Sequence, residues 1–123
     1  EIGERLGPFD ATLIEAGAYN QAWPDWHLGP EQALRANLML RGRLLIPIHW
    51  GLFRLAYHTW TDPAGRVLAA ARADGQTVFV PQPGQSLEPS ALPPPRRWWP
   101  SLPWVRAADD PIVSTKMDRT VPD

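Results

Sequence analysis

Apolar and polar positions divide the first part of the chain into short apolar runs and longer segments with helical spacing. The apolar runs are short and continuous, as in buried strands, and occupy residues 11–15, 44–49 and 77–81. Pro47 lies inside the second run and cannot donate a ladder hydrogen bond. We therefore expect three strands, with a sheet edge or a bulge at Pro47.

The two segments between these runs, residues 30–42 and 61–75, have the spacing of amphipathic helices. Pro30 and Pro63 stand at the start of their segments, where a helix tolerates a missing N–H, and Gly75 ends the second. Strands that alternate with helices predict an α/β fold with a mostly parallel sheet.

The chain opens on "EIGERLG", which reads as the last turns of a helix. Gly7 and Pro8 then stop it, since glycine just past a helix end and proline beyond it are common stop signals. Because a domain seldom begins inside a helix, we expect this chain to be the C-terminal part of a longer fold.

The composition changes after Gly84, where prolines become frequent and prevent regular secondary structure. Trp98, Trp99 and Trp104 are nevertheless too apolar for a purely disordered tail. We expect a body over residues 1–89 and an irregular Pro/Trp-rich extension over residues 90–123. The tryptophans either pack onto the body, which we favour, or form a contact surface for a partner or a lipid interface.

Charge and composition exclude several classes of function. The net charge is −1 with acids and bases interspersed, so there is no basic face for nucleic acid. The absence of cysteine excludes disulfides and thiolate metal sites, and fits a reducing compartment. No apolar run approaches the roughly 20 residues of a membrane span. We expect a cytoplasmic protein, with association at a membrane surface left open, and homo-oligomerisation left open as well.

Two histidines lie where the fold class predicts ligand binding. In open α/β sheets, ligands bind outside the carboxyl ends of the strands. His49 ends the second apolar run, and His27 and Tyr19 belong to the aromatic loop that follows the first. An imidazole there can bind a metal through one nitrogen while the other is held by a neighbour. By spacing alone, a packed strand-end His49 and a partly exposed loop His27 are favoured, since a zinc site needs three or four ligands. His58 follows no strand-end pattern and receives no role.

Two motifs resemble one family. "GAYNQAWPDWHLGPEQAL" at residues 17–34, followed by "IPIHWGLFRL" at residues 46–55, resembles the C-terminal half of a metallo-β-lactamase-fold hydrolase. The branch is that of N-acyl-phosphatidylethanolamine-hydrolysing phospholipase D and bacterial lactonase-like proteins. The resemblance covers roughly residues 9–89, and Leu52 stands where that family usually has threonine. It implies the C-terminal half of an αββα sandwich.

The resemblance also implies roles for single residues. His49 would be the last ligand of a centre of two metal ions, usually zinc, while His27 and Tyr19 would line the substrate pocket. Metals of this kind activate water for attack on a phosphodiester, lactone or related ester. His27 would contact the substrate or the developing negative charge. Gly51 would let the chain turn away after the rigid strand has delivered His49.

The family's His-x-His-x-Asp-His motif, a further histidine and a bridging aspartate come earlier in that fold, and none of them occurs here. The resemblance therefore implies a partner: the N-terminal half of the same fold, as a separate chain or as preceding residues. This chain alone would be inactive. The alternative is a non-catalytic α/β module that binds a partner or a lipid surface through its Trp-rich tail.

Overall fold

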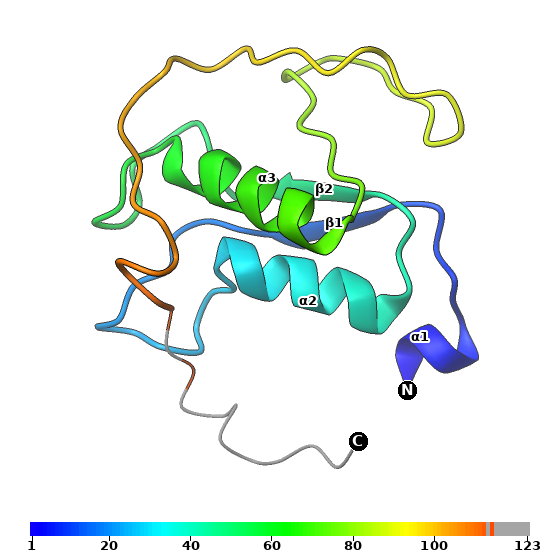
Figure 1. Cartoon of the computed structure of the whole chain (residues 1–123), viewed down its shortest axis with the longest axis horizontal. Helices are drawn as coiled ribbons and strands as arrows, with labels where there is room; N and C mark the ends of the chain where they lie inside the picture. Colours follow the sequence, from blue (N-terminus) through cyan, green and yellow to red (C-terminus); the bar gives the residue numbers. More distant parts are fainter. Residues whose placement is uncertain (113, 115–123) are drawn as a thin grey trace.

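The computed structural model describes residues 1–112 and 114, in which two helices cover one face of a small parallel sheet (Figure 1). In chain order the elements are α1 (Ile2–Arg5), β1 (Thr12–Glu15), α2 (Pro30–Leu40), β2 (Leu45–Ile48) and α3 (Asp62–Asp74). The predicted α/β alternation is confirmed over these elements, with boundaries that differ from the predicted ones by a few residues at most.

The sheet pairs β1 and β2 in parallel, with Thr12 opposite Leu45 and Glu15 opposite Ile48. The register continues just past both strands, where the Ala16 N–H donates to the Ile48 carbonyl at 3.0 Å. Both carboxyl ends therefore lie at the same edge of the sheet, as parallel pairing requires. The loops that follow the two strands start side by side.

The third predicted strand, residues 77–81, is wrong as a full strand. Its contact with β2 is a single parallel bridge between Val78 and Leu45, made by the Leu45 N–H to Thr77 and the Phe79 N–H to Leu45. The next rung would need an N–H from Pro47, and the one after it an N–H from Pro81. Proline has no N–H to donate, so the ladder stops after one bridge.

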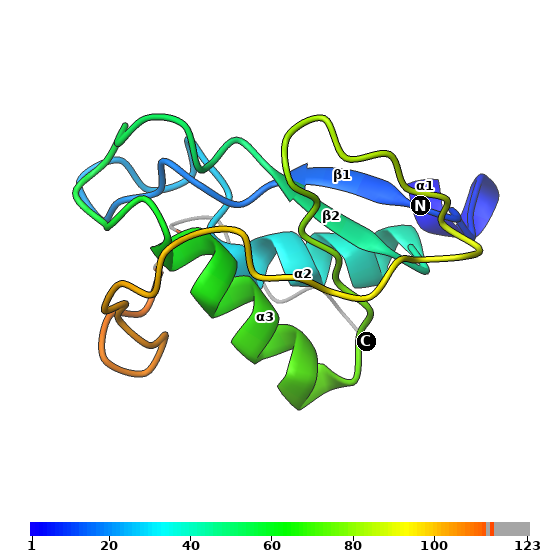
Figure 2. The same cartoon turned by 90° about the horizontal axis from the view of Figure 1, so that it is seen from above.

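The main core lies between the sheet and the two long helices, which cover the same face in both views (Figures 1 and 2). It is formed by small and branched apolar residues from β1 and the residue after it, β2, α2 and α3: Ile14, Ala16, Ala33, Leu34, Leu45, Val67 and Ala71. Each fully buried Leu or Val contributes roughly 1.5–3 kcal/mol of hydrophobic stabilisation. This packing fixes the strand ends relative to the start of α2.

The opposite face of the sheet is only partly covered. Leu44, Ile46 and Phe79 form a second cluster there, against which Leu87 and Leu92 of the later chain pack. Further along the same face, Leu13 of β1 is 63% exposed and Ile48 of β2 is 42% exposed. This face therefore carries an apolar surface next to the strand ends.

The Trp-rich segment packs inward over part of its length. Trp99 is buried and meets Trp50 and Trp98 edge-on, with ring centroids 5.6 and 5.5 Å apart. Trp104 lies against Gly65 of α3 and is 37% exposed. From residue 85 onward the described chain has no helix or strand. Residues 113 and 115–123 of the expected extension lie outside the described part.

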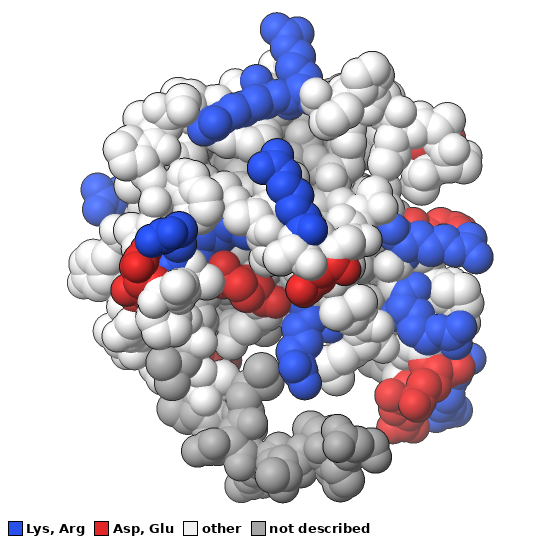
Figure 3. All heavy atoms as spheres, viewed as in Figure 1, with Lys and Arg blue, Asp and Glu red and all other residues white. Residues whose placement is uncertain are grey.

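Charged side chains of both signs are interspersed on the face shown in Figure 3. Most described ion pairs are exposed, such as Arg43–Asp10 at 2.8 Å. Such pairs contribute little to stability. No helix among the described residues has the length and apolar character needed to cross a membrane.

Candidate metal centre

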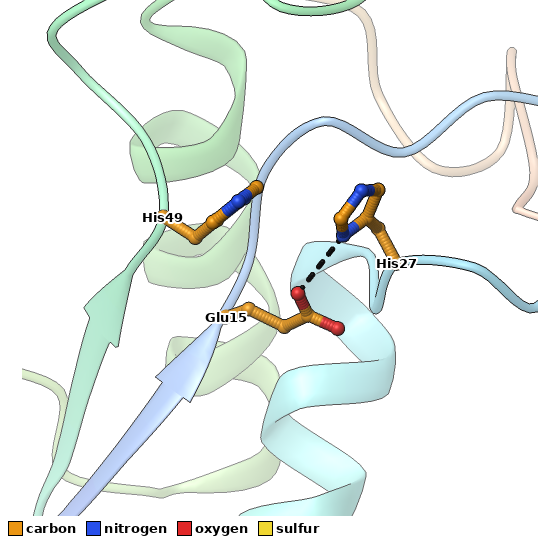
Figure 4. Close-up of side chains that lie close together, drawn as sticks. All are labelled: Glu15, His27 and His49. Carbon is orange, nitrogen blue, oxygen red and sulfur yellow. Dashed lines mark hydrogen bonds and ion pairs between the residues drawn. The ribbon is translucent and has the colours of Figure 1, made fainter.

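Three polar side chains meet at the carboxyl edge of the sheet. Glu15 ends β1, His49 follows β2, and His27 comes from the loop that enters α2 (Figure 4). One potential ligand atom from each residue lies within 4.8 Å of the other two. We call these three residues the strand-end site.

The backbone around His49 is unusual and places its ring at the edge. His49 has φ of 62°, in the left-handed region that few residues other than glycine adopt. The Gly17 Cα lies against the His49 carbonyl: an added Cβ would lie 2.3 Å from that oxygen, so a side chain does not fit. Gly51 has φ of 93°, and there the chain turns away, as expected.

The Glu15 carboxylate joins the strand to the start of α2. Its Oε2 lies 3.0 Å from Nδ1 of His27, and its Oε1 accepts the Leu28 N–H at 3.0 Å. Partial burial alone would raise the pKa of Glu15, but the hydrogen bonds from His27 and Leu28 outweigh it. The pKa of Glu15 is therefore below its ordinary value, and the group is ionised at neutral pH.

The two histidine rings face each other. Their centroids are 4.8 Å apart and their planes differ by 25°. His49 is exposed, and it lines a hollow of about 170 Å³ with Gly51 and Leu52. His27 is one-third exposed and lines a different hollow of about 310 Å³. The rings therefore stack on each other at the carboxyl edge, and each lines its own hollow.

The donor set fits a metal ion such as zinc. Imidazole nitrogens and carboxylate oxygens are both ordinary zinc ligands. His49 makes no hydrogen bond to any described residue, so both of its ring nitrogens are available. In contrast, both Glu15 oxygens and Nδ1 of His27 already have partners. His49 is therefore the ligand that the site offers most readily.

Tyr19 lines neither the His49 hollow nor the His27 hollow. Its ring is 4% exposed, stacks on His58 at 4.2 Å between centroids, and lies below the Arg66 guanidinium at 5.3 Å. Burial raises the pKa of the Tyr19 hydroxyl, which has no hydrogen-bond partner among the described residues. Tyr19 lines a third hollow with His58 and Asp62. We call Tyr19, His58 and Arg66 the Tyr19 cluster.

His58, for which the sequence pattern indicates no role, has a structural one. Its Nε2 accepts the Ala18 N–H at 3.1 Å, and its Nδ1 donates to the Thr59 carbonyl at 2.8 Å. Burial lowers the pKa of His58, so the neutral ring is favoured. The ring therefore ties the loop after β1 to the loop after β2.

Glu15 is the member of the site that sequence reasoning missed. The strand-end rule covers Glu15 as well as the histidines and aromatics, because Glu15 is itself the last residue of an apolar run. A carboxylate at the carboxyl end of a strand, at the same edge as His49, is the sequence feature that identifies Glu15 as a candidate site residue.

Comparisons with known proteins agree with these features. The model of the family described as "Beta-lactamase superfamily domain" matches residues 1–50. An uncharacterized protein of Mycobacterium tuberculosis is 49% identical over 102 residues, which cover 80% of this chain and 27% of that protein.

Two further relatives carry functional names. N-acyl-phosphatidylethanolamine-hydrolyzing phospholipase D 1 of Caenorhabditis elegans is 42% identical over 55 residues, covering 43% of this chain and 15% of that protein. A protein of Pyrobaculum aerophilum named as a metal-dependent hydrolase is 34% identical over 87 residues, covering 71% of this chain and 34% of that protein. The chain thus spans about a third or less of the length of these relatives.

Proposed function

The chain belongs to the metallo-β-lactamase-fold superfamily, and from this premise we propose that it supplies one metal ligand and part of the substrate pocket of a metal-dependent hydrolase. One observation carries the proposal. An exposed His49 without a hydrogen-bond partner among the described residues faces His27 at the carboxyl edge of a parallel sheet.

In this proposal, His49 holds one of two zinc ions, and the other ligands come from the N-terminal half of the fold. When bound, the metals supply Lewis-acid polarisation of the ester and an activated water. The backbone of β2 and the turn at Gly51 hold the His49 ring at the edge of the sheet. His27, held by Glu15, contacts the substrate beside it.

The uncovered face of the sheet supports the proposed N-terminal half as a partner. Leu13 and Ile48 are exposed apolar residues next to the strand ends. A second sheet packed on this face would bury them and complete an αββα sandwich. The same partner would bring its ligands to the edge that carries His49.

The surroundings of His49 support an ester with an apolar part. The loop that follows it exposes four large apolar side chains, and the His27 loop exposes another: Leu52, Phe53, Leu55, Tyr57 and Trp26. Exposed apolar groups gathered around a polar centre are typical of a surface that binds an apolar ligand. We propose a phosphodiester, lactone or related ester of lipid-like character.

The test is to replace His49 with Ala in the chain together with the N-terminal half of the fold. We expect one metal equivalent to be lost by elemental analysis. We also expect kcat/KM for bis(4-nitrophenyl) phosphate or a fatty-acyl lactone to fall by about 100-fold or more, because metal catalysis contributes several kcal/mol. His58→Gln is the matched control, since the ring nitrogens of His58 are already occupied, and it should keep both metals. Unchanged metal content and turnover in His49→Ala would contradict the proposal.

A further inference from the structure

We propose that Glu15 is a positioning residue that fixes the tautomer and orientation of His27, so that Nε2 of His27 is the atom presented to the substrate. This inference deepens the proposed function and rests on it for the role of His27. The geometry of Glu15 itself does not depend on that function.

The carboxylate holds two consecutive residues of the loop at once. One oxygen meets the His27 ring at 3.0 Å and the other accepts the Leu28 N–H at 3.0 Å. Because Glu15 belongs to β1, these bonds fix the loop to a strand that is paired with β2 and packed against the main core. The His27 ring can then neither turn over nor move along the edge without losing a charge-assisted hydrogen bond.

The contact also decides which nitrogen is available. An ionised carboxylate only accepts hydrogen bonds, so Nδ1 of a neutral His27 must carry the proton. Nε2 then holds the lone pair, and it has no hydrogen-bond partner among the described residues. From this position, Nε2 can take a proton or a hydrogen bond from water or substrate. The resulting imidazolium would remain paired with Glu15, as in other carboxylate–histidine pairs.

The same contacts argue against Glu15 as a third metal ligand. Its oxygens are close enough to the two histidines to share a metal ion. However, ligation would break a bond to His27 or to Leu28 and release the entrance of α2 (Figure 4). The arrangement therefore favours Glu15 as a hydrogen-bond partner of His27, with His49 as the metal ligand.

The test is nuclear magnetic resonance of [15N]histidine-labelled protein that includes the N-terminal half, with the His27 signals assigned through their loss in His27→Gln. At mildly alkaline pH, long-range proton–nitrogen spectra should show protonated Nδ1 and unprotonated Nε2. Glu15→Ala should give a mixture of both tautomers. Glu15→Gln should retain much of the wild-type pattern, because its amide oxygen can accept from Nδ1. Glu88→Ala, at an exposed glutamate of the later chain, is the matched control.

Elemental analysis and turnover complete the experiment. We expect Glu15→Ala to keep its metal and to lose about 10- to 100-fold in kcat, with partial rescue by Glu15→Gln. An unchanged His27 tautomer in Glu15→Ala would overturn the proposal, as would loss of a metal equivalent in both Glu15 variants. If the wild type hydrolyses no ester, the proposed function fails, while the tautomer result still decides the role of Glu15. If Glu15→Ala does not fold, the Glu15→Gln variant decides: an unprotonated Nδ1 of His27 in that variant would contradict the proposed role of Glu15.

Discussion

The strand-end site and the Tyr19 cluster both contain histidine but use it in opposite ways. In the Tyr19 cluster, both His58 nitrogens bind backbone groups, and Arg66 is 1% exposed and paired with Glu31. In the strand-end site, the described residues leave Nε2 of His27 and both nitrogens of His49 without a hydrogen bond. Occupied ring nitrogens indicate a structural histidine, whereas available ones at a strand edge indicate a ligand or a catalytic group.

The largest expected effect on stability belongs to the Tyr19 cluster. Arg66 donates to both oxygens of Glu31 at 2.9 Å, and its guanidinium also donates to the Asp110 carbonyl and lies over Tyr19. Arg66→Met should lower the free energy of unfolding by about 3 kcal/mol, because it leaves Glu31 without its counter-charge. Urea denaturation monitored by tryptophan fluorescence measures this change.

Arg43 provides the matched control for Arg66. Its pair with Asp10 is exposed on both sides, so Arg43→Met should change the free energy of unfolding by less than about 0.5 kcal/mol. Equal losses in the two variants would remove the distinction between a buried and an exposed arginine. The His27 tautomer should stay unchanged in both.

Sequence reasoning predicted the elements of this fold because their signals are local. Pro30 marks the start of α2, and Gly75 ends α3 with φ of 64°. It also placed His27 and His49 at the ends of neighbouring strands, because parallel strands bring their carboxyl ends to one edge. The prediction of a strand at residues 77–81 was wrong because the ladder would need N–H groups from Pro47 and Pro81, a requirement that depends on strand pairing rather than on the local pattern.

The partners of single side chains were not predictable in the same way. Tyr19 follows β1 closely, yet the chain turns there, with φ of 62° at Ala18, and Tyr19 stacks on His58. That stacking depends on α3 and on the loop before it. Glu15 could have been included from its strand-end position, but its two hydrogen bonds depend on how the α2 entrance packs.

A smaller effect concerns the pH dependence of His58. Its folded-state pKa is lowered by burial from the ordinary value of 6.5, so the unfolded chain binds the proton more readily. The stabilisation by neutral His58 is therefore complete above about pH 6.5 and is lost as the pH falls toward the lower folded pKa. A charged ring would also carry a proton at Nε2, which now accepts the Ala18 N–H.

His58→Gln isolates this contribution. Between about pH 7 and pH 5, the free energy of unfolding of the wild type should fall more steeply than that of His58→Gln. Parallel slopes for wild type and His58→Gln would show that the Tyr19 cluster does not select the neutral ring.

The smallest expected effect belongs to His49 and has the opposite sign. A residue with a side chain is strained at φ of 62°, whereas glycine adopts this conformation freely. His49→Gly should therefore raise the free energy of unfolding of the metal-free protein by about 0.5 kcal/mol, even though it removes the ring. His49→Ala keeps the strained backbone and should not be stabilising.

Since both variants lose the same stacking on His27, their difference in urea midpoint isolates the backbone strain. A His49→Gly protein less stable than His49→Ala would mean that the left-handed turn costs nothing. A gain confined to His49→Gly would show that the chain keeps a histidine here against its own stability, as expected of a residue retained for function.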